Sequence, residues 1–148
     1  MSTVYKRPES VLVVIYSVTG EVLLLERCQP AGYWQSVTGS LELGESARDA
    51  AIREVREETG LQVRENLVDC AYSNLFEIVP AWRARYAPDV NWNTEHVFRV
   101  ELAAKDPINI NAEEHVQAEW VPAQQAAERV GSHTNRAAIE RYVSARII

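Results

Sequence analysis

The sequence is poor in cysteine and contains no long apolar run. Its two cysteines, Cys28 and Cys70, lie far apart, and neither has a second Cys or His at the spacing of metal ligands. This excludes a zinc ribbon and a CxxC redox motif, so we expect two reduced, free thiols. No stretch approaches the roughly 18 apolar residues that a membrane helix needs, and the start of the chain does not resemble a signal peptide. The sequence therefore predicts a cytoplasmic protein without membrane contact.

Basic residues are in the minority. The 15 Lys and Arg stand against 21 Asp and Glu, which gives a net charge of −6. Such a chain repels a nucleic-acid backbone unless a cation or a local basic patch intervenes, whereas a small anionic substrate carried with a metal remains compatible. Glycine and proline are scarce, with six of each, and 47% of the residues are hydrophobic. We therefore expect an ordered globular chain, with residues 1–148 forming a single domain.

Apolar patterning predicts a mixture of strands and helices. We expect strands, the first two joined as a hairpin, at residues 10–17, 21–27, 34–38, 67–79, 95–102 and 117–121. Helical spacing predicts two helices near the end of the chain, at residues 123–130 and 135–147.

A further helix is predicted over residues 47–59. Ser46 is a suitable N-cap, and Gly60 is a suitable left-handed stop. At about 100° per residue, one stripe of this helix carries small residues followed by three carboxylates. Its members are Ala47, Ala50, Ala51, Glu54, Glu57 and Glu58.

The clustered carboxylates have two interpretations. Like charges at this spacing repel one another, and a hard cation such as Mg²⁺, or Mn²⁺ as a substitute, would relieve the repulsion. Alternatively, the helix is simply a solvated acidic surface, paired through Arg53 and Glu57 at i, i+4. The helix alone does not decide between these interpretations.

The preceding loop extends the pattern. Gly39 is followed after five residues by Glu45 and, after seven more, by the run Arg-Glu-Val-Arg-Glu-Glu-Thr-Gly-Leu at residues 53–61. This arrangement over residues 39–61 resembles the complete Nudix signature, in which many positions are specified at fixed spacing. The resemblance implies the Nudix fold, an α/β/α sandwich around a mixed β-sheet. It also implies that divalent cations are held against a diphosphate.

The resemblance implies roles for the acidic residues as well. Glu54 and Glu58 would be metal ligands, Glu57 a further ligand or a base, and Glu45 an auxiliary carboxylate that orients Arg53. The backbone carbonyl of Gly39 would lie within reach of the metal.

Several stretches outside the motif resemble one branch of the family, the enzymes that cleave dihydroneopterin triphosphate in bacterial folate synthesis. They are residues 4–8, 33–40, 85–88, 93–95 and 132–140. This resemblance implies a Mg²⁺-dependent hydrolase that converts 7,8-dihydroneopterin triphosphate to the monophosphate and pyrophosphate. The alternatives are a pyrophosphohydrolase for oxidised or other nucleoside triphosphates, an enzyme for dinucleoside polyphosphates, and a catalytically silent nucleotide-binding domain.

A triphosphate substrate requires basic partners beside the metal. Lys6, Arg7 and Arg27 are the candidates, and Lys6 and Arg27 match positions that resemble substrate contacts in this branch. Thr38 would add a hydroxyl hydrogen bond. The alternative for the basic side chains is that they are ordinary solvated surface charges.

A flat pterin ring needs an apolar platform and a hydrogen-bond acceptor. Residues Phe76, Glu77, Ile78 and Val79 offer both. Strand alternation also allows Phe76 and Ile78 to belong to the core while Glu77 faces water.

Two residues in the second half of the chain complete the candidate site. Glu114 is a candidate third metal ligand or general base, or else a surface acid. Ser132 is a candidate substrate contact, or else a helix N-cap.

The remaining aromatic and histidine residues carry weaker signals. Residues 82–86 and Trp92 interleave basic and aromatic side chains, as a single-stranded nucleic-acid platform does, although a subunit contact or a lid over the ring fits equally well. His96, His115 and His133 fit no metal-binding spacing, which favours ordinary hydrogen-bonding roles. We predict a small-molecule partner and no nucleic-acid partner, and the oligomeric state stays open.

Overall fold

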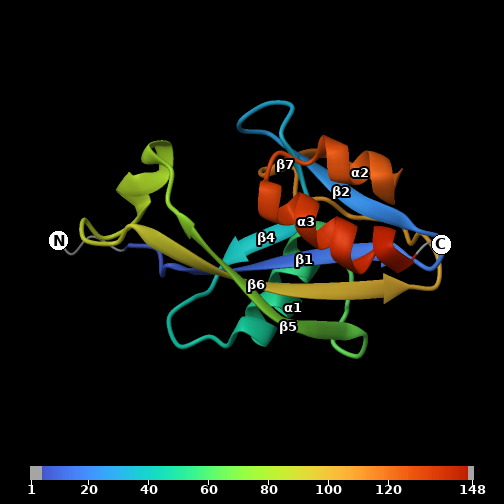
Figure 1. Ribbon diagram of the computed structural model, residues 1–148, viewed down its shortest axis with the longest axis horizontal. Coiled ribbons are helices and arrows are strands. Elements are labelled where there is room, and N and C mark those ends of the chain that lie inside the picture. Colours follow the sequence, from blue (N-terminus) through green and yellow to red (C-terminus); the bar gives the residue numbers. More distant parts are fainter. Residues whose placement is uncertain (1–4, 147–148) are drawn as a thin grey trace.

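A mixed β-sheet forms the centre of the molecule. The computed structural model describes residues 5–146. Strand β1 (Glu9–Ser17) pairs in parallel with β6 (Trp92–Leu102) and antiparallel with β4 (Val37–Ser40). The sheet runs in the order β3-β2-β1-β6-β5, with β4 joined to β1 and β7 joined to β2 (Figure 1). The other strands are β2 (Glu21–Arg27), β3 (Trp34–Gln35), β5 (Leu67–Glu77) and β7 (His115–Pro122).

Helices cover both faces of this sheet. On one face, α1 (Ala47–Thr59) packs on the alternate β1 side chains of Val11, Val13 and Ile15. On the other face, α2 (Ala123–Arg129) and α3 (His133–Tyr142) pack on the residues between them, including Leu12 and Val14. Because β1 is buried on both faces, its sequence is an unbroken apolar run. The layers confirm the predicted α/β/α sandwich (Figure 1).

The expected strand at 34–38 is wrong in one respect, because it is two strands. β3 pairs with β2, and β4 pairs with β1. Between them, buried Ser36 donates its backbone N–H to Asn135 Oδ1 at 2.8 Å. The chain therefore pairs with β2 before this residue and with β1 after it. Gly39 consequently lies within β4 and not in a loop.

Other boundaries differ by a few residues. α1 matches its predicted bounds. α3 begins earlier than expected, because Ser132 caps it, and it ends at Tyr142, followed by the short 3₁₀ helix η2 (Ser144–Arg146). Strand β5 is bulged between Asp69 and Tyr72, and a second 3₁₀ helix, η1 (Pro80–Arg85), follows it. Residue 4 of the first resembling stretch and residue 147 of the predicted last helix lie outside the described residues.

Both cysteines are free, as expected. Over residues 5–146, no helix is long and apolar enough to cross a membrane.

Candidate active site

The site is organised by the helix α1. Ser46 Oγ accepts the backbone N–H of Asp49, and Gly60 adopts the left-handed conformation that ends the helix. Ala50 and Ala51 are fully buried, so the small side chains bring this face of α1 close to the sheet. The acidic end of the same face is thereby held against the mouth of a cavity of about 1080 Å³.

Glu58 is the most unusual acid in the molecule. Its exposed fraction is 1%, and neither carboxylate oxygen has a hydrogen-bond partner of good geometry among residues 5–146. Burial, followed by the neighbouring Glu54 carboxyl, raises the pKa of Glu58 well above its usual value. A buried acid without a well-aligned hydrogen bond is costly to the fold, and such an exception points to a ligand. This position excludes the alternative of a simply solvated acidic helix.

Glu54 lies beside Glu58 and depends on the signature glycine. A Cβ atom built on Gly39 would overlap with the Glu54 carboxyl group, so only glycine allows this carboxylate to lie against β4. Burial raises the pKa of Glu54 as well, while Arg53 opposes the rise. The glycine therefore serves the close approach of a carboxylate to the backbone, and not a left-handed turn.

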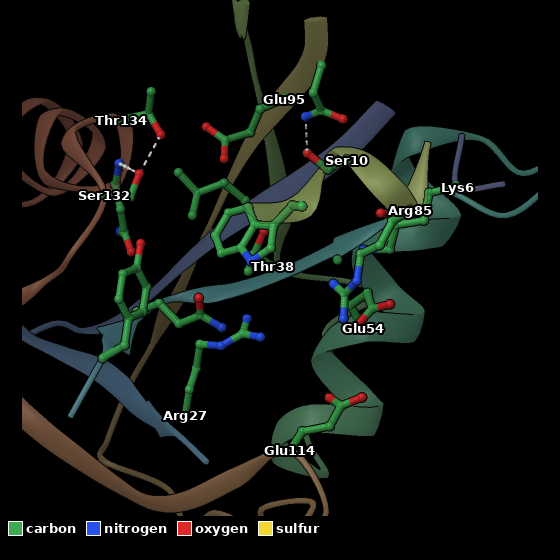
Figure 2. Close-up of a pocket in the computed structure, with 18 of the residues that line it drawn as sticks. Lys6, Ser10, Arg27, Thr38, Glu54, Arg85, Glu95, Glu114, Ser132 and Thr134 are labelled. Atoms are coloured by element: carbon green, nitrogen blue, oxygen red, sulfur yellow. Dashed lines mark hydrogen bonds between the residues drawn. The ribbon is translucent and has the colours of Figure 1, made fainter. Parts of the chain in front are cut away.

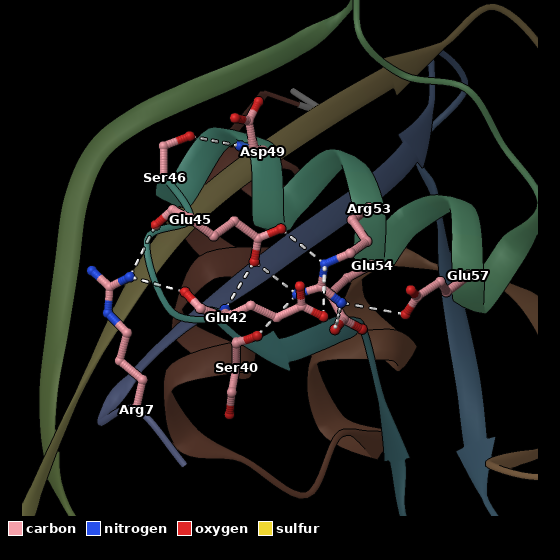
Figure 3. A network of polar contacts seen from close by, with 9 residues as sticks. All are labelled: Arg7, Ser40, Glu42, Glu45, Ser46, Asp49, Arg53, Glu54 and Glu57. Carbon is pink, nitrogen blue, oxygen red and sulfur yellow. Dashed lines mark hydrogen bonds and ion pairs between the residues drawn. The ribbon is translucent and has the colours of Figure 1, made fainter. Parts of the chain in front are cut away.

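Arg53 connects the loop to the helix. Its guanidinium forms a two-pronged ion pair with Glu45, at 2.9 Å from both Nε and Nη2 (Figure 3). It also reaches Glu54 Oε1 at 2.7 Å and the carbonyl oxygen of Ser40 at 3.1 Å. The expected pairing of Glu45 with Arg53 is thus present, and the same guanidinium holds the Glu54 carboxylate in place beside Gly39.

Replacing Arg53 with lysine is expected to lower kcat by about 10- to 100-fold, because an ammonium group cannot span Glu45, Glu54 and the Ser40 carbonyl together. The matched control is Arg56→Lys on the exposed face of the same helix. Steady-state kinetics of both variants measure the effect. Equal activities for the two variants would contradict the positioning role of Arg53.

The carboxylates of Glu54, which is half-buried, and Glu58, which is buried, fit a divalent cation. Hard cations take carboxylate oxygens, and the oxygens of Glu58 have no competing hydrogen-bond partner of good geometry within the described chain. Glu114 lines the same cavity from the turn before β7. Glu57 is not among the lining residues, and Arg53 contacts it at 3.4 Å. Among residues 5–146, no three acidic, histidine or cysteine side chains form a complete metal site.

His115 differs from the sequence expectation. Both ring nitrogens are buried without a hydrogen bond in the described part of the chain, so the expected ordinary hydrogen-bonding role is wrong here. Its Nε2 lies 3.7 Å from Glu58 Oε1, and burial lowers the pKa of His115. His96, in contrast, does have an ordinary partner, at 3.0 Å from Glu9 Oε2.

Basic side chains line the same cavity as the acids. Lys6, Arg27 and Arg85 all line it, and Figure 2 shows Arg27 extending into the cavity. Desolvation, followed by the positive charges of Arg85 and Arg27, lowers the pKa of Lys6. Such a group of mutually repelling cations favours an anionic ligand. Arg7 does not line the cavity and instead bonds Glu9 and the carbonyls of Glu42 and Glu45.

Thr38 and Ser132 line the cavity but also have structural partners. The hydroxyl of Thr38 donates to the carbonyl oxygen of Val11 at 2.9 Å. Ser132 caps α3 and shares a 2.9 Å hydrogen bond with the hydroxyl of Thr134. The N-cap alternative for Ser132 is therefore correct as a description of the fold, and a substrate contact remains compatible with it.

The segment expected to hold the ring is divided. Phe76, Glu77 and Val79 line the cavity, whereas Ile78 is buried and does not. Trp82 lines the same region from η1, but Trp92 does not.

The sequence analysis assigned no substrate-binding role to Arg85, Asn93 and Glu95, all of which line the cavity. A signal was present, because these residues stand in two of the stretches that carry the branch resemblance. What was missing was the strand register, which places Glu95 beside Ser10 of β1.

The family profile described as NUDIX domain matches residues 6–142. With the fold and the acidic helix described above, the chain belongs to the Nudix family. The chain is 46% identical to the dihydroneopterin triphosphate diphosphatase of Escherichia coli (strain K12) over 144 residues. The aligned region covers 95% of each of the two chains. The Haemophilus influenzae enzyme of the same name is 43% identical over 143 residues, or 94% of this chain and 89% of that one.

Solved structures agree with these relatives. The structure of the E. coli dihydroneopterin triphosphate pyrophosphohydrolase superposes with a TM-score of 0.89 at 45% identity, over 97% of this chain and 99% of the other. A Nudix hydrolase from Listeria monocytogenes gives a TM-score of 0.80 at 21% identity, which shows a shared fold.

Proposed function

We propose that this Nudix hydrolase cleaves 7,8-dihydroneopterin triphosphate to the monophosphate and pyrophosphate, as a step of folate biosynthesis. The observation that carries the chemistry is that the buried carboxylate of Glu58, whose oxygens lack a hydrogen-bond partner of good geometry in the described chain, belongs to the same cavity as Lys6, Arg27 and Arg85. The near full-length similarity to the two bacterial enzymes supports the choice of substrate.

Glu54 and Glu58 are proposed to hold the divalent cation, Mg²⁺ or Mn²⁺, with Glu114 and Glu57 as further ligands or as the base. A cation there would neutralise phosphate charge and help to activate a water molecule for attack on phosphorus. Arg53 and Gly39 keep the Glu54 carboxylate in place. The protein's own carboxylates then share the task of accepting the proton of that water.

The basic residues are proposed to bind the phosphate chain. The charges of Arg85 and Arg27 lower the pKa of Lys6, and those of Glu54 and Glu114 raise it. Lys6 therefore lies between the acidic and basic parts of the cavity. In that position it would contact the outer phosphates and stabilise charge on the leaving pyrophosphate. Thr38 and Ser132 are proposed as neutral contacts, and Phe76, Glu77 and Val79 as the surroundings of the ring. Ile78 would support that wall from behind.

The products and the cation requirement test this proposal. The purified protein is incubated with dihydroneopterin triphosphate and Mg²⁺, Mn²⁺ or a chelator, and pyrophosphate and inorganic phosphate are followed separately. We expect stoichiometric pyrophosphate and the monophosphate with either cation, and none with the chelator. Release of single phosphates, or turnover in the chelator, would contradict the proposal.

A further inference from the structure

A second buried carboxylate lies in the cavity, away from the acidic helix. Glu95 of β6 has an exposed fraction of 6% and lines the cavity. In Figure 2 it lies near Thr134 at the start of α3, separated from Glu54 and Glu114. The proposed cleavage does not use Glu95, so its burial needs another explanation.

The position of Glu95 is one where an apolar residue would be expected. Val97, two residues further along β6, belongs to the core beneath α2 and α3. Strand alternation directs Asn93 and Glu95 to the same face, and both are buried. A core that turns polar at the wall of a cavity breaks the local pattern, which is typical of functional sites.

Neutral groups and one imidazole are the partners of Glu95. Asn74 Nδ2 donates to Glu95 Oε1 at 3.1 Å, and Thr134 and His133 also favour its charged form. Burial outweighs them and raises the pKa of Glu95. A carboxylate can accept about four hydrogen bonds, so donors from a ligand would supply what the cavity lacks.

Asn93 has a similar deficit. Its Nδ2 donates to Ser10 Oγ at 2.8 Å, whereas its Oδ1 is buried without a partner in the described chain. Two residues with spare acceptor capacity, Glu95 and Asn93, therefore line the cavity, and in Figure 2 Glu95 lies apart from Lys6 and Arg27. A ligand with a polyanionic end and a donor-rich end would match both parts.

We propose that Glu95, assisted by Asn93, determines specificity by accepting hydrogen bonds from adjacent N–H donors of the substrate's heterocycle. The class of ligand is a 2-amino-4-oxopyrimidine edge, in which a ring N–H stands next to an amino group, as in pterins and guanine. Two parallel N–H donors fit the two oxygens of a carboxylate. This inference rests on the proposed function for the identity of the ring, and it assigns to Glu95 the acceptor role expected of exposed Glu77.

The test compares triphosphates that differ in this edge. GTP and ITP differ only by the 2-amino group, and dihydroneopterin triphosphate carries the same edge as GTP. Values of kcat and KM with Mg²⁺ are measured for the wild type, Glu95→Gln, Glu77→Gln and the exposed control Glu65→Gln. Binding of neopterin, which has no phosphate, is measured in a chelator by tryptophan fluorescence.

For Glu95→Gln, we expect kcat/KM for the pterin and for GTP to fall at least about 10-fold, mainly through KM, with ITP changed less than about 3-fold. The GTP preference over ITP should disappear, and neopterin should bind about 10-fold more weakly. Glu95→Asp keeps the charge but shortens the side chain by one methylene, so it should give a smaller loss of kcat/KM for the pterin and for GTP. It also provides a second test if Glu95→Gln folds poorly.

Three results would overturn the inference. They are a retained GTP preference in Glu95→Gln, an equal fall for ITP, and loss of the preference in Glu77→Gln in place of Glu95→Gln. Failure of the proposed function is distinguishable. In that case the wild type would not cleave the pterin substrate, while the comparison of GTP with ITP and the neopterin binding would still report on Glu95.

Discussion

Replacing Glu58 with glutamine is expected to lower kcat at least about 10³-fold, which corresponds to about 4 kcal/mol of lost transition-state stabilisation. The substitution removes a charge from the proposed cation site and changes the side-chain volume little. The same variant should be more stable than the wild type when no cation is present. Glu58 is 1% exposed and its carboxylate oxygens have no good hydrogen-bond partner among residues 5–146, so its charge opposes folding.

Thermal unfolding separates these two effects. In a chelator, we expect the melting temperature of Glu58→Gln to exceed that of the wild type by about 3 °C, or about 1 kcal/mol for a chain of this size. Mg²⁺ should stabilise the wild type and leave the variant unchanged. Glu57→Gln serves as the stability control, because the side chain of Glu57 is 47% exposed. A Glu58→Gln variant that melts below the wild type in a chelator would contradict the claim that the buried Glu58 carboxylate destabilises the fold when no cation is bound.

The second large effect is expected for Gly39→Ala. The added methyl group would occupy the position of the Glu54 carboxyl group and displace it from β4. A displacement of about 1 Å in a catalytic group can reduce the rate by about 10²-fold, and we expect a loss of kcat/KM of that order or larger. The Mg²⁺ concentration that gives half-maximal activity should also rise.

A double-mutant cycle shows whether Gly39 acts through Glu54. Glu54→Asp shortens the side chain and makes room for the methyl group. Adding Gly39→Ala to Glu54→Asp should therefore cost much less than adding it to the wild type. If Gly39→Ala reduced activity by the same factor in Glu54→Asp as in the wild type, or if Gly39→Ala were fully active, the close approach of Glu54 to Gly39 would be unimportant for activity.

The helix and its loop could be predicted from the sequence because their signals are local. Ser46 and Gly60 mark the ends of α1, and Glu45 and Arg53 stand at fixed motif positions. The burial of Glu58 could not be predicted in this way, because Glu57 and Glu58 are chemically identical neighbours. Only packing against the sheet makes Glu58 buried and leaves Glu57 exposed.

Contacts between distant elements were the part that the sequence did not predict. Ser36 interrupts the expected strand because its partner, Asn135, comes from α3 at the other end of the chain. His115 is buried against Glu58 because β7 pairs with β2 beside α1. Glu95 reaches the cavity through the register of β6 with β1 and β5. The cytoplasmic location, the identity of the cation and the roles of the individual site residues stay predictions.

Competition between substrates tests the central claim most directly. The purified protein with Mg²⁺ is given equal concentrations of dihydroneopterin triphosphate, common and oxidised deoxynucleoside triphosphates and a dinucleoside polyphosphate, and each is followed over time. We predict that the pterin is consumed first, with kcat/KM at least about 10-fold above any nucleotide. A nucleotide consumed before the pterin would contradict the proposed substrate and leave the hydrolytic chemistry in place. An absence of turnover of any of them would contradict both.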